Sequence, residues 1–196
     1  MLAHSQGAYT ESMAVVPTIT LVSADEYLTS SYHPDMEFVD GALVERGVPT
    51  ISHGLLQHVL CVYLDAFRTE FEFEPLPAVR TQIVERARYR IPDVMLCPLP
   101  VPAGIMTSAP WAVIEILSPE DRFSDVVARF QDYKKIGVRH MVLLDPEDLV
   151  AYRFENGALA QTQIASLELP TGDLPFDSED LFRRLTARCN RVATVS

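Results

Sequence analysis

Two acidic residues, Asp93 and Glu115, lie in segments where a carboxylate is costly. Segments 90–96 and 111–117 both have the composition of short strands, with apolar residues on both sides of the acid. A carboxylate inside a buried strand destabilises a fold by several kcal/mol unless it is paired, protonated or bound to a metal. Two such acids on neighbouring strands can hold a hard cation such as Mg²⁺ through oxygen. A cation bound there can generate hydroxide from water and stabilise charge on a phosphoryl group.

Each acid also has a purely structural explanation. Asp93 follows Pro92 and could cap a turn, and Glu115 could belong to a structural ion pair. Neither acid has an obvious basic neighbour in the sequence. Removing one charge from an acidic pair relieves repulsion, so replacing either acid by its amide is expected to leave the stability of the metal-free protein level or higher. The same replacement is expected to abolish metal-dependent activity.

The elements that must position these acids alternate between helices and strands. Apolar residues recur every three to four positions over about 50–70, which predicts a long amphipathic helix. Asp-Gly at 40–41 and Asn-Gly at 156–157, each between apolar segments, predict two hairpins. The other expected elements are helices at 23–29, 121–136 and 177–188, and strands near 79–86, 91–97, 111–117 and 138–144. This order predicts an α/β or α+β domain with a mixed sheet.

The chain has 196 residues, of which 48% are hydrophobic, enough for one domain with a substantial core. Residues 1–17 lack periodicity and end in a proline, so we expect a flexible tail followed by a single domain at 18–196. The three cysteines are scattered, which fits a reducing cytoplasm and gives no zinc knuckle. We find neither a signal peptide nor an apolar window of about 18 residues, and therefore expect a soluble cytoplasmic protein without a membrane partner.

The net charge of −11 is unfavourable for a general nucleic-acid binder, because such proteins usually neutralise phosphates with a basic patch. Arg80, Arg86, Arg88 and Arg90 nevertheless lie close together before Asp93. The last three of these arginines would share one side of a regular strand and form a local basic surface. A solvated edge that deters sheet-to-sheet pairing explains them equally well.

A series of short motifs over about residues 20–155 resembles the Uma-two type of bacterial restriction endonucleases, within the PD-(D/E)XK nuclease superfamily. The motifs are Glu37, Asp40-Gly41, His53, Pro92-Asp93-Val94, Glu115-Ile116-Leu117-Ser118-Pro119, Tyr133, Gly137-Val138 and Asp145-Pro146. Their order and spacing make the match specific. The resemblance implies a restriction-endonuclease-like core, in which helices flank a mixed central β-sheet and the metal site lies where strands diverge.

The resemblance also implies roles for individual residues. Asp93 and Glu115 would bind Mg²⁺ (or Mn²⁺), the backbone carbonyl of Ile116 could add a ligand, and Glu37 would be a third acid near the site. The superfamily places a lysine two residues after the second acid, where this chain has Leu117. In the Uma-two type this lysine moves into the following helix, to the position of Arg129. Arginine keeps the positive charge and can clamp phosphate, but it does not titrate near neutral pH.

The remaining candidates have stronger structural explanations. His53 falls near the start of the long helix, where the family often has a histidine, and a capping or surface role is the simpler account. Trp111 and Tyr133 fit the core. The sequence supports no phosphate-cradling glycine loop and no Ser-His-Asp or Cys-His arrangement.

Together these features predict a metal-dependent endonuclease that acts on nucleic acid, with DNA favoured over RNA. The alternative is a catalytically reduced protein of the same fold that binds nucleic acid or a protein partner without cleavage. A third hypothesis, a small-molecule phosphoesterase, is favoured by the acidic net charge. The sequence leaves the oligomeric state open, a homodimer included.

Overall fold

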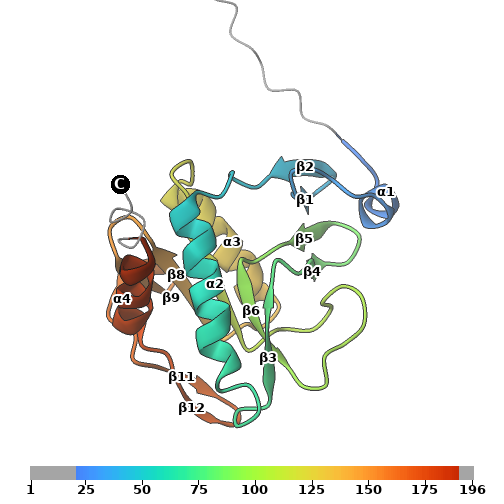
Figure 1. Cartoon of the computed structure of the whole chain (residues 1–196). Helices are drawn as coiled ribbons and strands as arrows, with labels where there is room; N and C mark the ends of the chain where they lie inside the picture. Colours follow the sequence, from blue (N-terminus) through green and yellow to red (C-terminus); the bar gives the residue numbers. More distant parts are fainter. Residues whose placement is uncertain (1–20, 190–196) are drawn as a thin grey trace, which may run out of the picture.

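The computed structural model describes residues 21–189 (Figure 1), so the expected tail at 1–17 lies outside the described residues. The helices are α1 (Ala24–Thr29), α2 (Ile51–Asp65), α3 (Phe123–Lys135) and α4 (Ser178–Cys189). The strands are β1 (Met36–Val39), β2 (Ala42–Glu45), β3 (Phe73–Pro77), β4 (Thr81–Val84), β5 (Arg88–Arg90), β6 (Val94–Pro98), β7 (Ala112–Ile116), β8 (His140–Asp145), β9 (Val150–Glu155), β10 (Ala158–Gln161), β11 (Ser166–Leu169) and β12 (Gly172–Pro175).

A mixed six-stranded sheet forms the centre of the fold, in the order β10-β9-β8-β7-β6-β3. Strands β7 and β8 are parallel and are connected through α3, whereas the other neighbours pair antiparallel. Helices α2 and α4 pack side by side on one face of the sheet, and α3 packs on the other face (Figure 1). The predicted fold class, a mixed sheet flanked by helices, is confirmed.

The alternation of side chains in β7 decides where Glu115 points. Ala112, Ile114 and Ile116 belong to the buried cluster under α2 and α4, whereas Val113 belongs to the cluster under α3. Because successive residues of a strand point to opposite faces, Glu115 shares the α3 face with Val113. The acid is therefore directed toward a helix that can supply polar partners.

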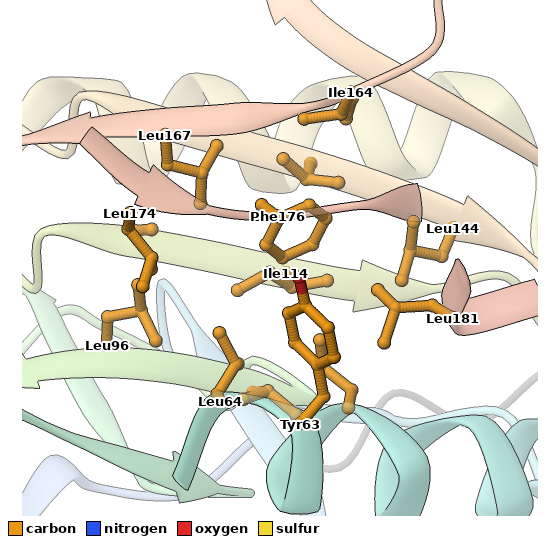
Figure 2. Close-up of a cluster of buried hydrophobic side chains, with 14 of the residues drawn as sticks. Tyr63, Leu64, Leu96, Ile114, Leu144, Ile164, Leu167, Leu174, Phe176 and Leu181 are labelled. Carbon is orange, nitrogen blue, oxygen red and sulfur yellow. The ribbon is translucent and has the colours of Figure 1, made fainter. Parts of the chain in front are cut away.

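The larger of these clusters fills the space between the sheet and helices α2 and α4 (Figure 2). Phe176 lies among side chains from the β11–β12 hairpin, the central strands and α2, and it is fully buried. The hydroxyl of Tyr63 on α2 accepts a hydrogen bond from the backbone N–H of Asp177 at 3.2 Å. This contact joins α2 to the start of α4.

A smaller sheet, in the order β2-β1-β5-β4, stands beside the central one. The predicted β1–β2 hairpin is confirmed, and its turn residues Asp40 and Gly41 have φ angles of 51° and 92°. Two positive φ angles in a two-residue turn suit the twist of a hairpin, and Asp-Gly accommodates them. Segment 46–50 then leads from β2 to α2.

Four regions differ from the sequence-based expectation. The helix expected to about residue 70 ends at Asp65 and continues as turns. The single strand expected at 79–86 is instead the hairpin of β4 and β5, which turns at Arg86 with a φ of 57°. Strand β3 was not predicted because it contains two prolines; it lies at the sheet edge, where a missing N–H is tolerated. The β11–β12 hairpin was also not predicted.

Candidate active site

Asp93 and Glu115 come together because of the register of β6 and β7. Val94 pairs with Ile114 at the end of this antiparallel ladder, so the two acids stand one residue further along, opposite each other. Their exposed fractions are only 3% and 2%. The sequence-based expectation of two buried acids on adjacent strands is thus what the fold contains.

Asp93 has a complete set of partners. Its Oδ1 accepts a hydrogen bond from the guanidinium of Arg46 and lies 3.3 Å from Nε2 of His53, and its Oδ2 accepts from the backbone N–H of Ile116 at 2.7 Å. Burial alone raises the pKa of Asp93, but the hydrogen bond from His53 and the charge of Arg46 outweigh it and hold this pKa below its ordinary value. The fold thus gives Asp93 a basic partner that is 47 residues away in the sequence.

Glu115 has far fewer partners than Asp93. Its Oε1 accepts a hydrogen bond from the hydroxyl of Tyr133 on α3 at 3.2 Å, and within residues 21–189 it makes no ion pair. Burial raises the pKa of Glu115 to about 8; the charge of Arg129 opposes this shift and that of Asp93 adds to it. A carboxyl this poorly compensated favours an added proton or an added cation.

His53 is buried beside Asp93, so its assignment as a surface residue is wrong. Thr50 caps α2 by accepting a hydrogen bond from the backbone N–H of His53, which fixes the histidine in the first turn. Nδ1 of His53 lies 3.1 Å from Oγ of Ser118. The fold therefore lines up Ser118, His53 and Asp93 in one row, an arrangement that the sequence did not predict. In this row His53 orients the Asp93 carboxylate.

Arg129 reaches the same site from α3. Its guanidinium donates to Oδ1 of Asp121 at 3.0 Å, and Oδ2 of Asp121 accepts from the backbone N–H of Ser118. Burial alone lowers the pKa of Arg129, but the charges of Glu115 and Asp121 outweigh it, so that this pKa lies above its ordinary value. The expected reach toward Glu115 is found, whereas the alternative partners Asp125 and Asp132 are not used. The catalytic role of Arg129 stays a prediction.

Glu37 lies on β1, next to this group, and is held by a different arginine. Its Oε2 accepts from Arg90 at 2.6 Å and its Oε1 accepts from the backbone N–H of Ile91 at 3.0 Å. Arg90 also donates two hydrogen bonds to Asp132 on α3. Glu37 is close enough to add its charge to the field on Glu115, and its arginine partner fixes it to the wall of the site.

A cavity of about 20 Å³ lies between the acids, with Asp93, Glu115, Ile116 and Arg129 among its lining residues. This volume holds about one water-sized group. A cleft of about 530 Å³ adjoins it between the β1–β2 hairpin and α3. Arg46, Arg90 and Arg129 line this cleft together with five acids: Glu37, Glu45, Glu120, Asp121 and Asp125.

The donor set suits a hard divalent cation of the Mg²⁺ type. Within the described residues no three Asp, Glu, His or Cys side chains form a metal-binding group. Mg²⁺ does not need such a cage, because it is usually bound by one or two carboxylates and keeps waters or substrate phosphates as its other ligands. Asp93 and Glu115 supply two carboxylates, Ile116 lies at the cavity wall, and Glu115 makes no ion pair in the part of the chain that the structure describes.

The predicted basic surface of four arginines is not formed. Arg86 pairs with Asp25, Arg88 pairs with Asp40 and Asp132, and Arg90 is buried between Glu37 and Asp132. The guanidinium of Arg80 stacks over the ring of Tyr27. Arg88 and Arg90 do share one side of β5, as strand alternation requires, but their charges are neutralised by acids that lie far away in the sequence.

Two members of the site, Arg46 and Ser118, were given no role from the sequence. Arg46 follows a hairpin and looks like an ordinary solvated residue, so no sequence signal identifies it. Ser118 stood out only as part of the Ser-Pro end of a strand. Tyr133 fits the apolar stripe of α3 and was assigned to the core, where it lies, but its hydroxyl also binds Glu115.

The fold is of the restriction-endonuclease-like class. A crystal structure described as "a putative nuclease belonging to DUF820 from Anabaena variabilis ATCC 29413" superposes with a TM-score of 0.71, over 84% of this chain and 99% of that one. The sequence identity is 20%, so this likeness concerns the fold alone.

The chain belongs to the Uma2 family, whose description reads "Putative restriction endonuclease" and whose model matches residues 24–186. The predicted resemblance to this family is thus confirmed. A search of curated proteins gave no match. Among the helices of residues 21–189, none has the length and apolar character needed to cross a membrane.

Proposed function

We propose that this protein is a metal-dependent nuclease that hydrolyses phosphodiester bonds. The observation that carries the proposal is the adjacency of two buried carboxylates, Asp93 and Glu115, at a cavity that adjoins an arginine-containing cleft. Membership of a family described as restriction endonucleases supports it independently and favours DNA as the substrate.

In this proposal Asp93, Glu115 and the backbone carbonyl of Ile116 hold Mg²⁺ or Mn²⁺. The bound ion supplies Lewis acidity to the phosphoryl group and lowers the pKa of water. His53 keeps the Asp93 carboxylate in position, and the hydroxyl of Tyr133 does the same for Glu115. Both contacts limit the rotation of a carboxylate that must face the cavity.

Arg129 serves as the phosphate clamp. It lines both the small cavity and the cleft, and its buried Nε has no hydrogen-bond partner among residues 21–189, so this N–H can donate to an incoming oxygen. A fixed positive charge stabilises negative charge that develops on phosphate in the transition state. Glu37, fixed by Arg90, contributes negative charge near the metal-binding acids and no direct contact to the nucleophile.

The test is a cleavage assay with plasmid DNA, single-stranded DNA, RNA and a small phosphodiester, in Mg²⁺, in Mn²⁺ and in EDTA. We expect cleavage of DNA in either metal, none in EDTA, and none for Asp93→Asn or Glu115→Gln. Exposed Glu155→Gln, which lies outside the cleft, is the matched control and should cut like the parent. Cleavage that survives EDTA or either acid substitution would refute the assignment.

A second candidate is a protein of this fold that binds nucleic acid without cutting it. Two observations favour it: Leu117 stands where the superfamily has lysine, and Arg46 already pairs with Asp93. DNA binding that is unaffected by metal, together with no cleavage of any substrate, would support this alternative. Cleavage of only the small phosphodiester would instead favour a small-molecule phosphoesterase.

A further inference from the structure

The guanidinium of Arg46 lies against Asp93, in the place that a cation bound to this acid would take. Arg46 is the first residue of segment 46–50, immediately after β2, and its guanidinium bonds Oδ1 of Asp93. The negative charges of Asp93, Glu115 and Glu37 all act on it: burial alone lowers the pKa of Arg46, and these acids raise it. Arg46 thus shares in compensating these acids, together with Arg129 beside Glu115 and Arg90 at Glu37.

The surroundings of Arg46 give its side chain a second place to go. It lines the small cavity, the 530 Å³ cleft on the α3 side and a further hollow of about 240 Å³ beside His53 and Gln57. The side chain is 20% exposed, in contrast to 4% for that of Asp93. Segment 46–50 has no regular secondary structure, so rotation of this side chain breaks no helix or strand hydrogen bond.

We propose that Arg46 is an exchangeable counter-cation of the acid pair. A divalent ion that binds Asp93 and Glu115 displaces the guanidinium, which then turns into the cleft and contacts the phosphate of the substrate beside Arg129. This inference rests on the proposed function, because it assumes a metal at these acids. It adds that metal binding is opposed by a charge of the protein itself, and that the same charge becomes a phosphate contact after exchange.

The size of the effect follows from electrostatics. Oδ1 of Asp93 already accepts from Arg46 and lies against His53, and Oδ2 accepts from the backbone N–H of Ile116, so a divalent ion at Asp93 competes with the Arg46 guanidinium. The attraction between Arg46 and Asp93 that is lost on exchange is largely recovered when the guanidinium finds phosphate or water, so only part of it opposes metal binding. Removing Arg46 should therefore strengthen metal binding by on the order of tenfold or more.

The experiment measures Mn²⁺ binding by isothermal titration calorimetry to the metal-free parent, Arg46→Met, Arg46→Gln and Arg183→Met. Arg183 is an equally charged arginine that pairs with Asp180 on α4 and serves as the control. We expect both Arg46 variants to bind Mn²⁺ about tenfold or more tightly than the parent, and the control to bind like the parent. If circular dichroism shows that the methionine variant is unfolded, the comparison rests on the glutamine variant, which keeps a polar group at the end of its side chain.

A second titration follows thymidine monophosphate in the presence of saturating Mn²⁺. The parent should bind it more tightly than either Arg46 variant, because only the parent can supply the released guanidinium. Equal Mn²⁺ affinity in the parent and the Arg46 variants, at a site that Glu115→Gln removes, would overturn this inference and leave the proposed nuclease intact. Absence of Mn²⁺ binding in all of them would overturn the metal site itself, and the inference with it.

Discussion

Replacing Glu115 by glutamine should stabilise the metal-free protein, and this is the sharpest consequence of the site's electrostatics. The pKa of Glu115 rises from its ordinary value of 4.5 to about 8 because of burial. At pH 7 the folded protein must therefore hold a proton that the unfolded chain has released. A difference of about 2.5 pH units at about 1.4 kcal/mol per unit gives an upper limit of about 3.5 kcal/mol for this cost.

The effect of Glu115 on stability depends on pH because its pKa is higher in the folded than in the unfolded state. At pH 4 the carboxyl is protonated in both states and costs nothing. As the pH rises from about 4.5 toward 8, the unfolded state is progressively favoured, so the parent loses stability that Glu115→Gln keeps. The new amide must find its own acceptor in the cavity, which offsets about 1 kcal/mol. We therefore expect a net gain of about 2 kcal/mol at pH 7 and a net loss of about 1 kcal/mol at pH 4.

Asp93→Asn should have the opposite effect, which corrects the sequence-based expectation that both amides leave stability level or higher. Asp93 accepts from Arg46, His53 and a backbone N–H, and its pKa is lowered rather than raised. Losing the charge leaves the guanidinium of Arg46 without its partner in a partly buried place. We expect a loss of about 1–3 kcal/mol at pH 7.

The assay is urea denaturation in EDTA at pH 4, 5.5, 7 and 8, with Glu120→Gln as an exposed control that should match the parent throughout. The midpoints give the differences in free energy of unfolding as long as the m value is unchanged. A gap between Glu115→Gln and the parent that stays constant from pH 4 to pH 8 would refute the assignment of a raised pKa. Equal destabilisation by both amides would refute the asymmetry between the two acids.

Three further predictions concern other residues of the site and core. Arg129→Ala should lower the DNA cleavage rate by on the order of 10²-fold, whereas Arg129→Lys should keep or raise it; initial rates in Mg²⁺ decide, and equal rates for both variants would remove Arg129 from the chemistry. His53→Ala should cost about 1–3 kcal/mol in urea denaturation and weaken Mn²⁺ binding, because Asp93 loses its orienting contact; unchanged metal affinity would leave His53 a purely structural role. Phe176→Ala should cost about 3–5 kcal/mol at every pH, since it empties the centre of the larger cluster, and a loss below about 1 kcal/mol would contradict its place there.

The two acids could be predicted from the sequence because the free-energy cost of burying a carboxylate shows in the residues next to it. An acid inside an apolar strand is visible from its immediate neighbours, and Asp93 and Glu115 each stand in such a segment. The helices α2 and α3 were visible for a similar reason, since an amphipathic stripe repeats within one element. The strands that the sequence did not predict, β3 and β11–β12, contain prolines or are too short to show a period.

The partners of the acids could not be predicted, because each pairing depends on contacts between distant segments. Arg46 and Asp93 are 47 residues apart, and His53 and Ser118 are 65 apart. The partners of the arginines before Asp93 could not be predicted for the same reason. They were grouped by sequence proximity, yet the fold gives Arg88 and Arg90 the buried carboxylate of Asp132 as a common partner. A group of arginines in the sequence therefore forms a basic surface only where the fold brings no carboxylate close to it.

The change from lysine to leucine at position 117 has a structural explanation in α3. Leu117 lies two residues after Glu115, and its side chain packs with the cluster under α3. An apolar side chain there removes the positive charge that the superfamily pattern supplies from the strand. Arg129 and Tyr133 are four residues apart and therefore share one face of α3, which places a guanidinium and a hydroxyl on the same side as Glu115. The phosphate contact that we propose for Arg129 therefore depends on α3 keeping its register against β7.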